Sequence, residues 1–321
     1  MKKFLWIITS IITIMVVVIC PFFLKSKKSE EKVKTAVITV WNVDSFEGGK
    51  GSRTTFLRNA CKNFSKRYKN VSFLVTSYTL EGVKTALSKG ITPDLISYGG
   101  CSLNLENYAE KISFSVKDGR ELSKGKRYAV SFLKGCYFKI EKGDKNGTVI
   151  LSKGDFTSPE IAGLFSDAKG INYQILSPIK AFNLFATKKA VTLIGTQRDV
   201  FRLINNEEEF TLTPILDYSD LYQYISLTAK GETEKFYARE FISYLLSDSV
   251  QEKLTSLGLF SVNKSGLYTG DEYFSKSEVL PNYTFSPYAD ISEYDNVCNL
   301  AFSSLTRGHN YDEIVKYLKQ L

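Results

Sequence analysis

The side chains best suited to bind a small molecule lie in a polar loop that follows a short apolar run. The run is AVITVW at residues 36–41, and the loop is NVDSFEGGKGSR at residues 42–53. Four polar residues of this loop are candidate ligand contacts: Asn42, Asp44, Glu47 and Arg53. If the run is a strand, the loop begins at its carboxyl end, where ligands of open α/β sheets bind. A solvated, glycine-rich turn is the alternative interpretation.

Four further residues are candidate ligand contacts: Trp41, Tyr98, Arg198 and Tyr222. The Trp41 ring can stack on a sugar face or belong to the core. Tyr98 precedes two glycines that let a ligand approach the backbone closely. Arg198 lies in GTQRD, where a helix is expected to begin, and its planar fork of donors fits carboxylates or hydroxyls, with a surface ion pair as the alternative. Tyr222 belongs to a tyrosine-rich segment in which one ring is expected to face the ligand and the others to pack.

The sequence gives no indication of enzyme chemistry. His309 is the sole histidine, so neither a Ser-His triad nor a histidine metal site is expected. The segment EGGKGS differs from a phosphate-binding loop because Gly51, not Ser or Thr, follows Lys50. We therefore predict a binding protein with no catalytic residue, no metal and no cofactor.

The cysteines leave two interpretations open. Cys61, Cys101, Cys136 and Cys298 are widely spaced and form no CxxC pair, which argues against zinc. Their even number permits disulfides if this part of the chain lies outside the cytoplasm. Scattered buried thiols are the other interpretation.

An uncharged N-terminal segment predicts attachment to a membrane. Residues 4–24 contain 21 residues without a charge, long enough to cross ~30 Å of hydrocarbon as a helix. Lys2 and Lys3 precede this segment, which favours export of everything that follows it. Small residues that a signal peptidase would need are missing, so an uncleaved anchor is expected, with lipidation of Cys20 as the alternative. Either outcome places the body outside the cytoplasm at the cell membrane.

The charge of the chain is concentrated around this segment. The formal net charge is +8, and five lysines flank the apolar residues: Lys2, Lys3, Lys25, Lys27 and Lys28. Without them the body carries about +3, and it has no dense basic stripe. We therefore expect no nucleic-acid partner.

The elements that must position the candidate residues alternate between strand and helix. After a charged linker at residues 29–35, the patterns predict strands at 36–41, 71–78 and 93–100, separated by helices at 54–68 and 80–90. This β-α-β-α-β order is typical of a parallel, doubly wound α/β sheet.

The remainder of the chain mixes strands and helices. Strands are expected within 128–143, 147–152, 190–195 and 218–228, and helices at 233–246, 247–258 and 310–321. A further helix is expected at 158–166, where Ser158 is the expected cap, Pro159 the first helical residue and Glu160 part of the first turn.

Several stretches resemble the bacterial extracellular solute-binding proteins of the ABC sugar-transporter type, family 1. They are ITVWNVDSFEGGKGSR, GITPDLISYGG, GKRYAVSFLKGCYFKI, KKAVTLIGTQRDVFRL and AREFISYLLSDSVQEKLTSLGLFSVNK. The last is the most specific, and together they cover most of residues 36–265 in the expected order. The sequence departs from the family at Ser131, where Pro is common, and in a shorter segment between Gly143 and Asn183.

The resemblance implies a two-lobed, periplasmic-binding-protein-like fold of type II. The N-terminal transmembrane helix expected from residues 4–24 would precede it, within a signal or anchor segment at residues 1–28. The resemblance also implies that residues 36–128 and 226–280 form lobe one, and residues 129–225 and 281–321 form lobe two. A small solute, by family a carbohydrate, would bind between the lobes for delivery to ABC permease subunits. The alternatives are a ligand sensor for a membrane kinase, a ligand-free structural protein of the same fold, and a tethered enzyme, which lacks a motif.

Overall fold

The computed structural model describes residues 35–43, 49–100, 102–112, 128–143, 147–285, 290–308 and 311–320. Residues Ala36–Leu321 form one compact unit. The predicted membrane segment at residues 4–24 lies outside the described residues, and so does the alternative lipidation site Cys20. Among the helices of the described ranges, none combines the length and the apolar character that crossing a bilayer needs.

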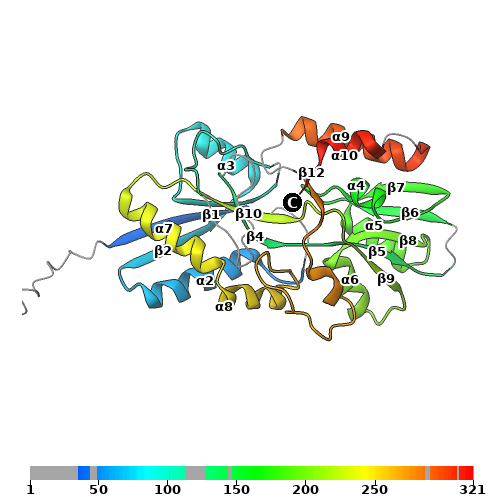
Figure 1. The fold of residues 1–321 in the computed structure, drawn as a ribbon, viewed down its shortest axis with the longest axis horizontal. Helices are drawn as coiled ribbons and strands as arrows, with labels where there is room; N and C mark the ends of the chain where they lie inside the picture. The colour runs from blue at the N-terminus through cyan, green and yellow to red at the C-terminus, as the bar shows by residue number, and fades with distance from the viewer. Residues whose placement is uncertain are drawn as a thin grey trace, which may run out of the picture. The chain divides into compact units, whose positions relative to one another are not determined.

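The first of two five-stranded sheets has the order β2-β1-β3-β10-β4. Its strands are β1 (Ala36–Asn42), β2 (Val71–Ser77), β3 (Leu95–Gly99), β4 (Val130–Lys134) and β10 (Tyr222–Leu227). β1 pairs in parallel with β2 and β3, whereas β10 runs antiparallel to both β3 and β4. All three predicted opening strands are therefore confirmed, and they are parallel as expected (Figure 1).

The second sheet has the order β7-β6-β8-β5-β9. Its strands are β5 (Tyr137–Glu141), β6 (Thr148–Ser152), β7 (Asn172–Leu176), β8 (Thr192–Thr196) and β9 (Thr211–Ile215). β6 lies parallel to β7 and β8, and β5 lies antiparallel to β8 and β9. Each sheet thus combines parallel strands with one reversed strand, β10 in the first sheet and β5 in the second.

Helices and short 3-10 helices connect and cover the strands. They are α2 (Arg53–Arg67), α3 (Leu80–Ser88), α4 (Pro159–Leu164), α5 (Pro178–Ala186), α6 (Gln197–Asn205), α7 (Glu232–Leu245), α8 (Asp248–Gln251), η1 (Glu252–Leu257), η2 (Ser275–Glu278), α9 (Ile291–Arg307) and α10 (Tyr311–Tyr317). A short pair of strands, β11 (Tyr283–Thr284) and β12 (Lys319–Gln320), lies beside them.

Helices α2 and α7 pack on the first sheet through aromatic side chains. Phe64 of α2 is 1% exposed, and its ring lies 5.6 Å from the rings of both Phe73 and Phe241. Burying a side chain of this size stabilises the fold by roughly 1.5–3 kcal/mol. The apolar face of the helix predicted at residues 54–68 therefore anchors α2 to the sheet.

Ser158 corrects one detail of the predicted helix starts. Its side chain makes no capping hydrogen bond to α4, although Pro159 does occupy the first turn as expected. The Ser158 hydroxyl instead donates to Asp220, 62 residues away. A strong tertiary partner therefore takes the hydroxyl away from the local backbone.

Several elements have no counterpart among the sequence-based expectations, among them β7, β9 and α9. β9 contains Pro214, which normally argues against a strand. It lies at the edge of the second sheet, where a residue without an N–H is tolerated.

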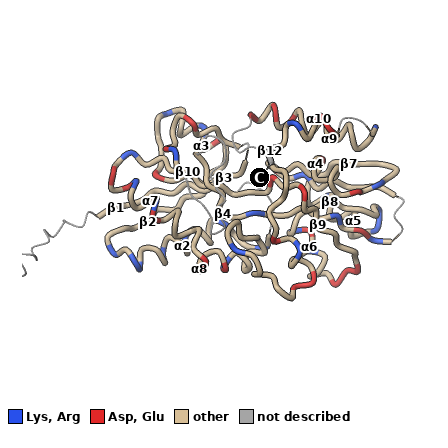
Figure 2. The backbone as a smooth tube through the Cα atoms, viewed as in Figure 1, with Lys and Arg blue, Asp and Glu red and all other residues tan. Residues whose placement is uncertain are grey.

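Charged residues of both signs are distributed over the elements of the two sheets. Figure 2 shows Lys and Arg as well as Asp and Glu on the elements of both sheets, whereas α2 carries Lys and Arg but no Asp or Glu. The described chain therefore carries both signs of charge on the two sheets, and α2 is a helix with positive charge only.

Candidate functional site

Two short links carry the chain between the sheets. Residues 135–136 join β4 to β5, and residues 216–221 join β9 to β10. The links contact each other, because the Gly135 N–H donates to the Leu221 carbonyl at 2.6 Å and the Ser219 hydroxyl donates to the Gly135 carbonyl at 3.3 Å. The predicted lobe boundaries at 128/129 and 225/226 stay predictions, but the strands show the crossings at these two links.

The first link joins the carboxyl ends of the parallel strands in both sheets. β4 ends at Lys134, and β5 begins at Tyr137, which pairs with Thr196 at the end of β8 and with Ile215 at the end of β9. The Cys136 N–H in the link donates to the Gln197 side chain at 3.1 Å, which holds it against the start of α6. The two edges where ligands of such sheets bind therefore meet at this link.

The carboxyl edge of the first sheet carries a buried network of amides and hydroxyls. The Gln223 amide donates to the Ser97 hydroxyl at 2.9 Å, to the Val43 carbonyl at 3.0 Å and to the Asn42 side chain at 3.4 Å. The Asn42 amide donates to the Thr54 hydroxyl at 2.9 Å. This network, here called the edge network, fixes the ends of β1 and β3 against the start of β10.

Gln223 was absent from the sequence-based candidates, although it is fully buried. The signal was a glutamine inside the apolar alternation of YSDLYQYISL, where a buried amide needs partners. Asn42, which was predicted, is also fully buried, and its amide bonds lie within the protein.

The structure places the predicted aromatic residues in or near the core. Trp41 is 7% exposed, and its ring lies 4.6 Å from that of the half-buried Tyr78. Tyr98 is fully buried, and its hydroxyl lies 3.0 Å from the Ser226 hydroxyl. Tyr222 is 3% exposed and pairs across the strands with Lys134 beside the first link.

The structure describes two of the remaining predicted residues, Arg53 and Arg198. Arg53 is 8% exposed at the start of α2. Asp44 and Glu47 lie outside the described residues, and so do Cys101 and His309. Arg198 is half-buried in the first turn of α6, at the carboxyl edge of the second sheet. Ligand contact for all eight predicted residues stays a prediction.

Arg198 lies beside a small polar cavity at the ends of β6 and β8. The cavity has about 10 Å³ of free space and is lined by Ser152, Gly154, Thr157, Pro178, Thr196, Arg198 and Asp199. This volume suits a single water molecule. The Thr196 N–H donates to the Asp199 carboxylate at 3.0 Å in a capping box, so the start of α6 is fixed before any ligand binds.

A buried carboxylate organises the second link. Asp220 is 7% exposed and accepts hydrogen bonds from Tyr137 at 2.7 Å, Ser158 at 2.5 Å and Tyr294 at 2.8 Å. Burial raises the pKa of the Asp220 carboxyl, and the three hydroxyl donors oppose that rise. These bonds attach the link to β5, to the start of α4 and to α9.

A buried amine lies at the end of β4, next to the first link. Lys134 is 1% exposed, and its ammonium donates to the backbone carbonyls of Ser277 at 3.0 Å and Val279 at 2.6 Å. The same ammonium lies 5.1 Å from the centre of the Phe260 ring. Burial lowers the pKa of Lys134 to about 8. The amine therefore attaches the end of β4 to η2 and to the residue that follows it.

The cysteines of the described residues are separate, buried side chains. Cys61, Cys136 and Cys298 are buried free thiols there, and burial raises the pKa of Cys136 to about 11. No group of three or more histidine, cysteine or acidic side chains in the described residues could hold a metal.

Comparison with known proteins shows the fold. No protein-family model matches the chain, and no curated protein sequence matches it. The sugar-binding protein MalE from Xanthomonas citri has a TM-score of 0.62 at 12% identity, over 88% of this chain and 95% of that chain. Iron-bound HitA from Pseudomonas aeruginosa has a TM-score of 0.54 at 11% identity, over 83% and 99%.

A third similar structure is described as a two-component system protein that mediates signal transduction. Its TM-score is 0.53 at 15% identity, over 82% of this chain and 100% of that chain. The chain therefore has the α/β two-sheet fold of these binding proteins, which confirms that part of the predicted fold, whereas the predicted N-terminal transmembrane helix stays a prediction. The three similar structures differ in ligand and role, so they identify no solute for this chain.

Proposed function

We propose that this chain is the extracytoplasmic solute-binding component of an ABC importer, and that it binds a carbohydrate between its two sheets. One observation carries the proposal: the carboxyl edges of both sheets meet at paired links only two and six residues long. Short links of this kind act as hinges that let two lobes close around a solute. The protein would bind its solute without transforming it.

Aromatic and polar groups at these edges suit a sugar. The half-buried Tyr78 offers aromatic surface after β2, and the buried Trp41 ring lies against it at the end of β1. Arg198 offers the donors of its guanidinium on the opposite edge. We assign direct contact to Trp41 and Arg198, together with Asp44, Glu47 and Arg53 of the loop after β1.

The buried candidates would act through the edges that they hold. Asn42 lies in the edge network, whereas Tyr98 and Tyr222 lie in β3 and β10 beside it. We assign these three residues to ligand contact only when the lobes rearrange on binding. Residues 4–24 would tether the body to the membrane, and the outer surfaces of the two sheets would dock on the permease subunits.

The test is a melting-temperature panel on the purified full-length chain. Sugars, amino acids, peptides and polyamines are each added in large excess. A ligand at 100 times its dissociation constant adds about 2.7 kcal/mol, or roughly 5 °C for a domain of this size. We expect one carbohydrate class to raise the melting temperature, and R198Q to reduce that shift while K230M, an exposed control distant in sequence, does not.

The alternative role is a ligand sensor for a membrane kinase, which the third similar structure favours. Transport and sensing separate in cells that lack this chain: an importer component abolishes uptake of the identified solute, whereas a sensor abolishes the transcriptional response and leaves uptake intact. A cooperative melt with no shift across the panel would contradict both roles and favour the ligand-free structural role.

A further inference from the structure

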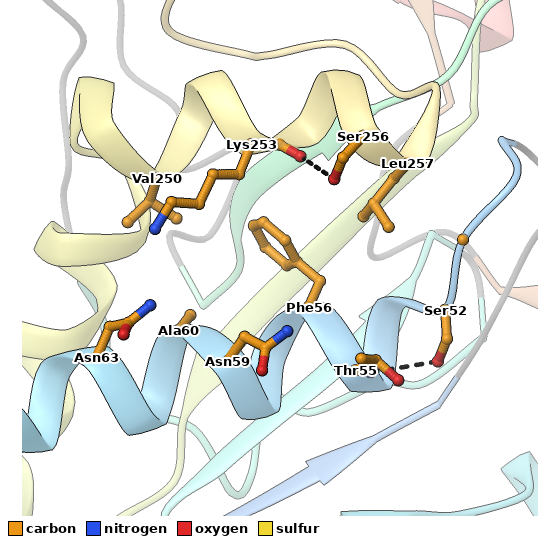
Figure 3. Close-up of a pocket in the computed structure, with 11 residues that line it drawn as sticks. Ser52, Thr55, Phe56, Asn59, Ala60, Asn63, Val250, Lys253, Ser256 and Leu257 are labelled. Atoms are coloured by element: carbon orange, nitrogen blue, oxygen red, sulfur yellow. Dashed lines mark hydrogen bonds between the residues drawn. The ribbon is translucent and has the colours of Figure 1, made fainter.

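A second cavity lies away from the links, between α2 and the α8–η1 segment (Figure 3). Its free volume is about 350 Å³, which falls in the range of small-molecule sites. The lining residues are Gly51, Ser52, Thr55, Phe56, Asn59, Ala60, Asn63, Val250, Lys253, Ser256 and Leu257. None of them is a residue that the proposed function uses.

The floor of this cavity is apolar and belongs to the main core. Phe56, Ala60, Val250 and Leu257 are each at most 8% exposed. The Phe56 ring lies between the two helices, with its face available to the cavity (Figure 3). A flat apolar group could therefore pack on this floor.

One end of the cavity is closed by the loop before α2. The Lys50 N–H donates to the Leu257 carbonyl at 2.7 Å. Gly49 has a φ of +77°, and a Cβ atom there would lie 2.1 Å from the same carbonyl oxygen. The loop therefore approaches η1 closely because residue 49 has no side chain, and it fixes the spacing of the two helices at this end.

The rim of the cavity is polar and carries one positive charge. The side chains of Asn59, Asn63 and Lys253 point toward the space between the helices (Figure 3). In the described part of the chain these three side chains have no hydrogen bond or ion pair, so their donors are available to a ligand. Among the residues that the structure describes, no acidic residue lines the cavity.

The backbone of α2 adds to this preference for negative charge. Ser52 caps the helix by accepting from the Thr55 N–H at 3.2 Å, and the first turn contains no acidic residue. The positive end of the helix dipole is therefore not compensated by a carboxylate at the closed end of the cavity.

We propose that this cavity is a binding site for a small carboxylic acid with a flat, apolar body. The apolar body packs on Phe56 and Ala60, the carboxylate accepts from the Lys253 ammonium, and the amides of Asn59 and Asn63 donate beside it. Charge-assisted bonds of this kind are stronger than neutral ones, so the charge decides which ligands bind. The site is separate from the solute site at the links and does not depend on it.

The test compares phenylacetate with phenylacetamide, which keeps the ring and removes the charge. Binding of each to the purified full-length chain is measured by titration calorimetry and saturation-transfer NMR. We expect phenylacetate to bind at least about tenfold more tightly than phenylacetamide. K253M should abolish this preference by weakening phenylacetate binding about tenfold or more, whereas the exposed control K230M should leave it unchanged.

Two further variants make each outcome decisive. A60L fills the cavity and should abolish binding of both probes, and its melting curve shows whether it folds; if it does not fold, K253M alone decides. R198Q reports on binding at the links. The proposal is overturned if phenylacetate fails to bind in the millimolar range, if both probes bind equally, or if R198Q rather than K253M weakens phenylacetate.

Discussion

The buried amine of Lys134, the last residue of β4, allows a quantitative prediction about the stability of the protein. The ammonium has two backbone carbonyl partners and no carboxylate within hydrogen-bonding distance among the described residues. Its pKa falls from 10.5 to about 8 in the folded protein. At pH 7 the amine is charged in both the folded and the unfolded chain, so burial of the charge lowers the free energy of unfolding there.

The sign of the pH dependence follows from proton counts. Between pH 8 and pH 10.5 the folded protein has lost the Lys134 proton while the unfolded chain still holds it. The free energy of unfolding therefore rises with pH in this interval. The difference between the two pKa values corresponds to roughly 3 kcal/mol.

The assay is urea unfolding of the wild type and of K134M from pH 7 to pH 10.5. Methionine keeps most of the side-chain length and removes the titrating group, so other titrations cancel in the difference between the two proteins. We expect the stability of the wild type relative to K134M to increase by roughly 3 kcal/mol over this interval. K230M, which changes an exposed lysine, should show no such trend.

A flat difference between wild type and K134M would refute this reasoning. It would mean that the Lys134 amine keeps an ordinary pKa in the folded protein, through water or movement of the link. A difference that falls with pH would show that the amine is held in its charged form, which would reverse the assigned effect of burial.

Three other substitutions test buried groups: one in the second link, one in the edge network and one between α2 and the first sheet. Burial raises the pKa of the Asp220 carboxyl, so the free energy of unfolding of the wild type should fall relative to that of D220N as the pH rises from about 4 to 7. Thermal unfolding of both proteins across that range checks this, and an opposite trend would contradict it. Q223L should cost about 1–3 kcal/mol in urea unfolding, because the buried Ser97 and Asn42 oxygens lose their donor, and an unchanged midpoint would contradict this expectation. F64A should cost about 3–5 kcal/mol by the same measurement, since it leaves a cavity between α2 and the first sheet; a loss below 1 kcal/mol would show that the helix does not depend on this contact.

The buried side chains of Asp220 and Lys134 have different hydrogen-bonding surroundings. Asp220 has three hydroxyl donors, which partly compensate its charge, whereas Lys134 has two carbonyl acceptors and an aromatic ring. Asp220 lies in the second link, and Lys134 is the last residue of β4, next to the first link. Any hinge movement between the sheets must therefore keep these bonds or exchange them for water.

Local patterns in the sequence were sufficient for the opening of the fold. β1, β2 and α2 each bury one face. The spacing of their apolar residues therefore predicts strand or helix directly. The positive φ of Gly258 at the end of η1 likewise follows from a residue without a side chain. In these cases the preference of a few neighbouring residues and the final structure agree.

Other features depended on partners distant in the chain. Ser158 has the sequence of a cap, but its hydroxyl bonds Asp220 because folding brings the second link against α4. Pro214 is compatible with β9 only because that strand lies at an edge, and strand order is not a local property.

The sequence by itself determined the alternation of strands and helices and the positions of the polar segments after the strands. It could not determine which polar side chains face a ligand, because Asn42, Tyr98 and Gln223 become buried only when β1, β3 and β10 pair. The cavity beside Lys253 likewise exists only where α2 and η1, almost 200 residues apart, pack together. Local periodicity records which face of an element is apolar, whereas a site is made by the contacts between elements.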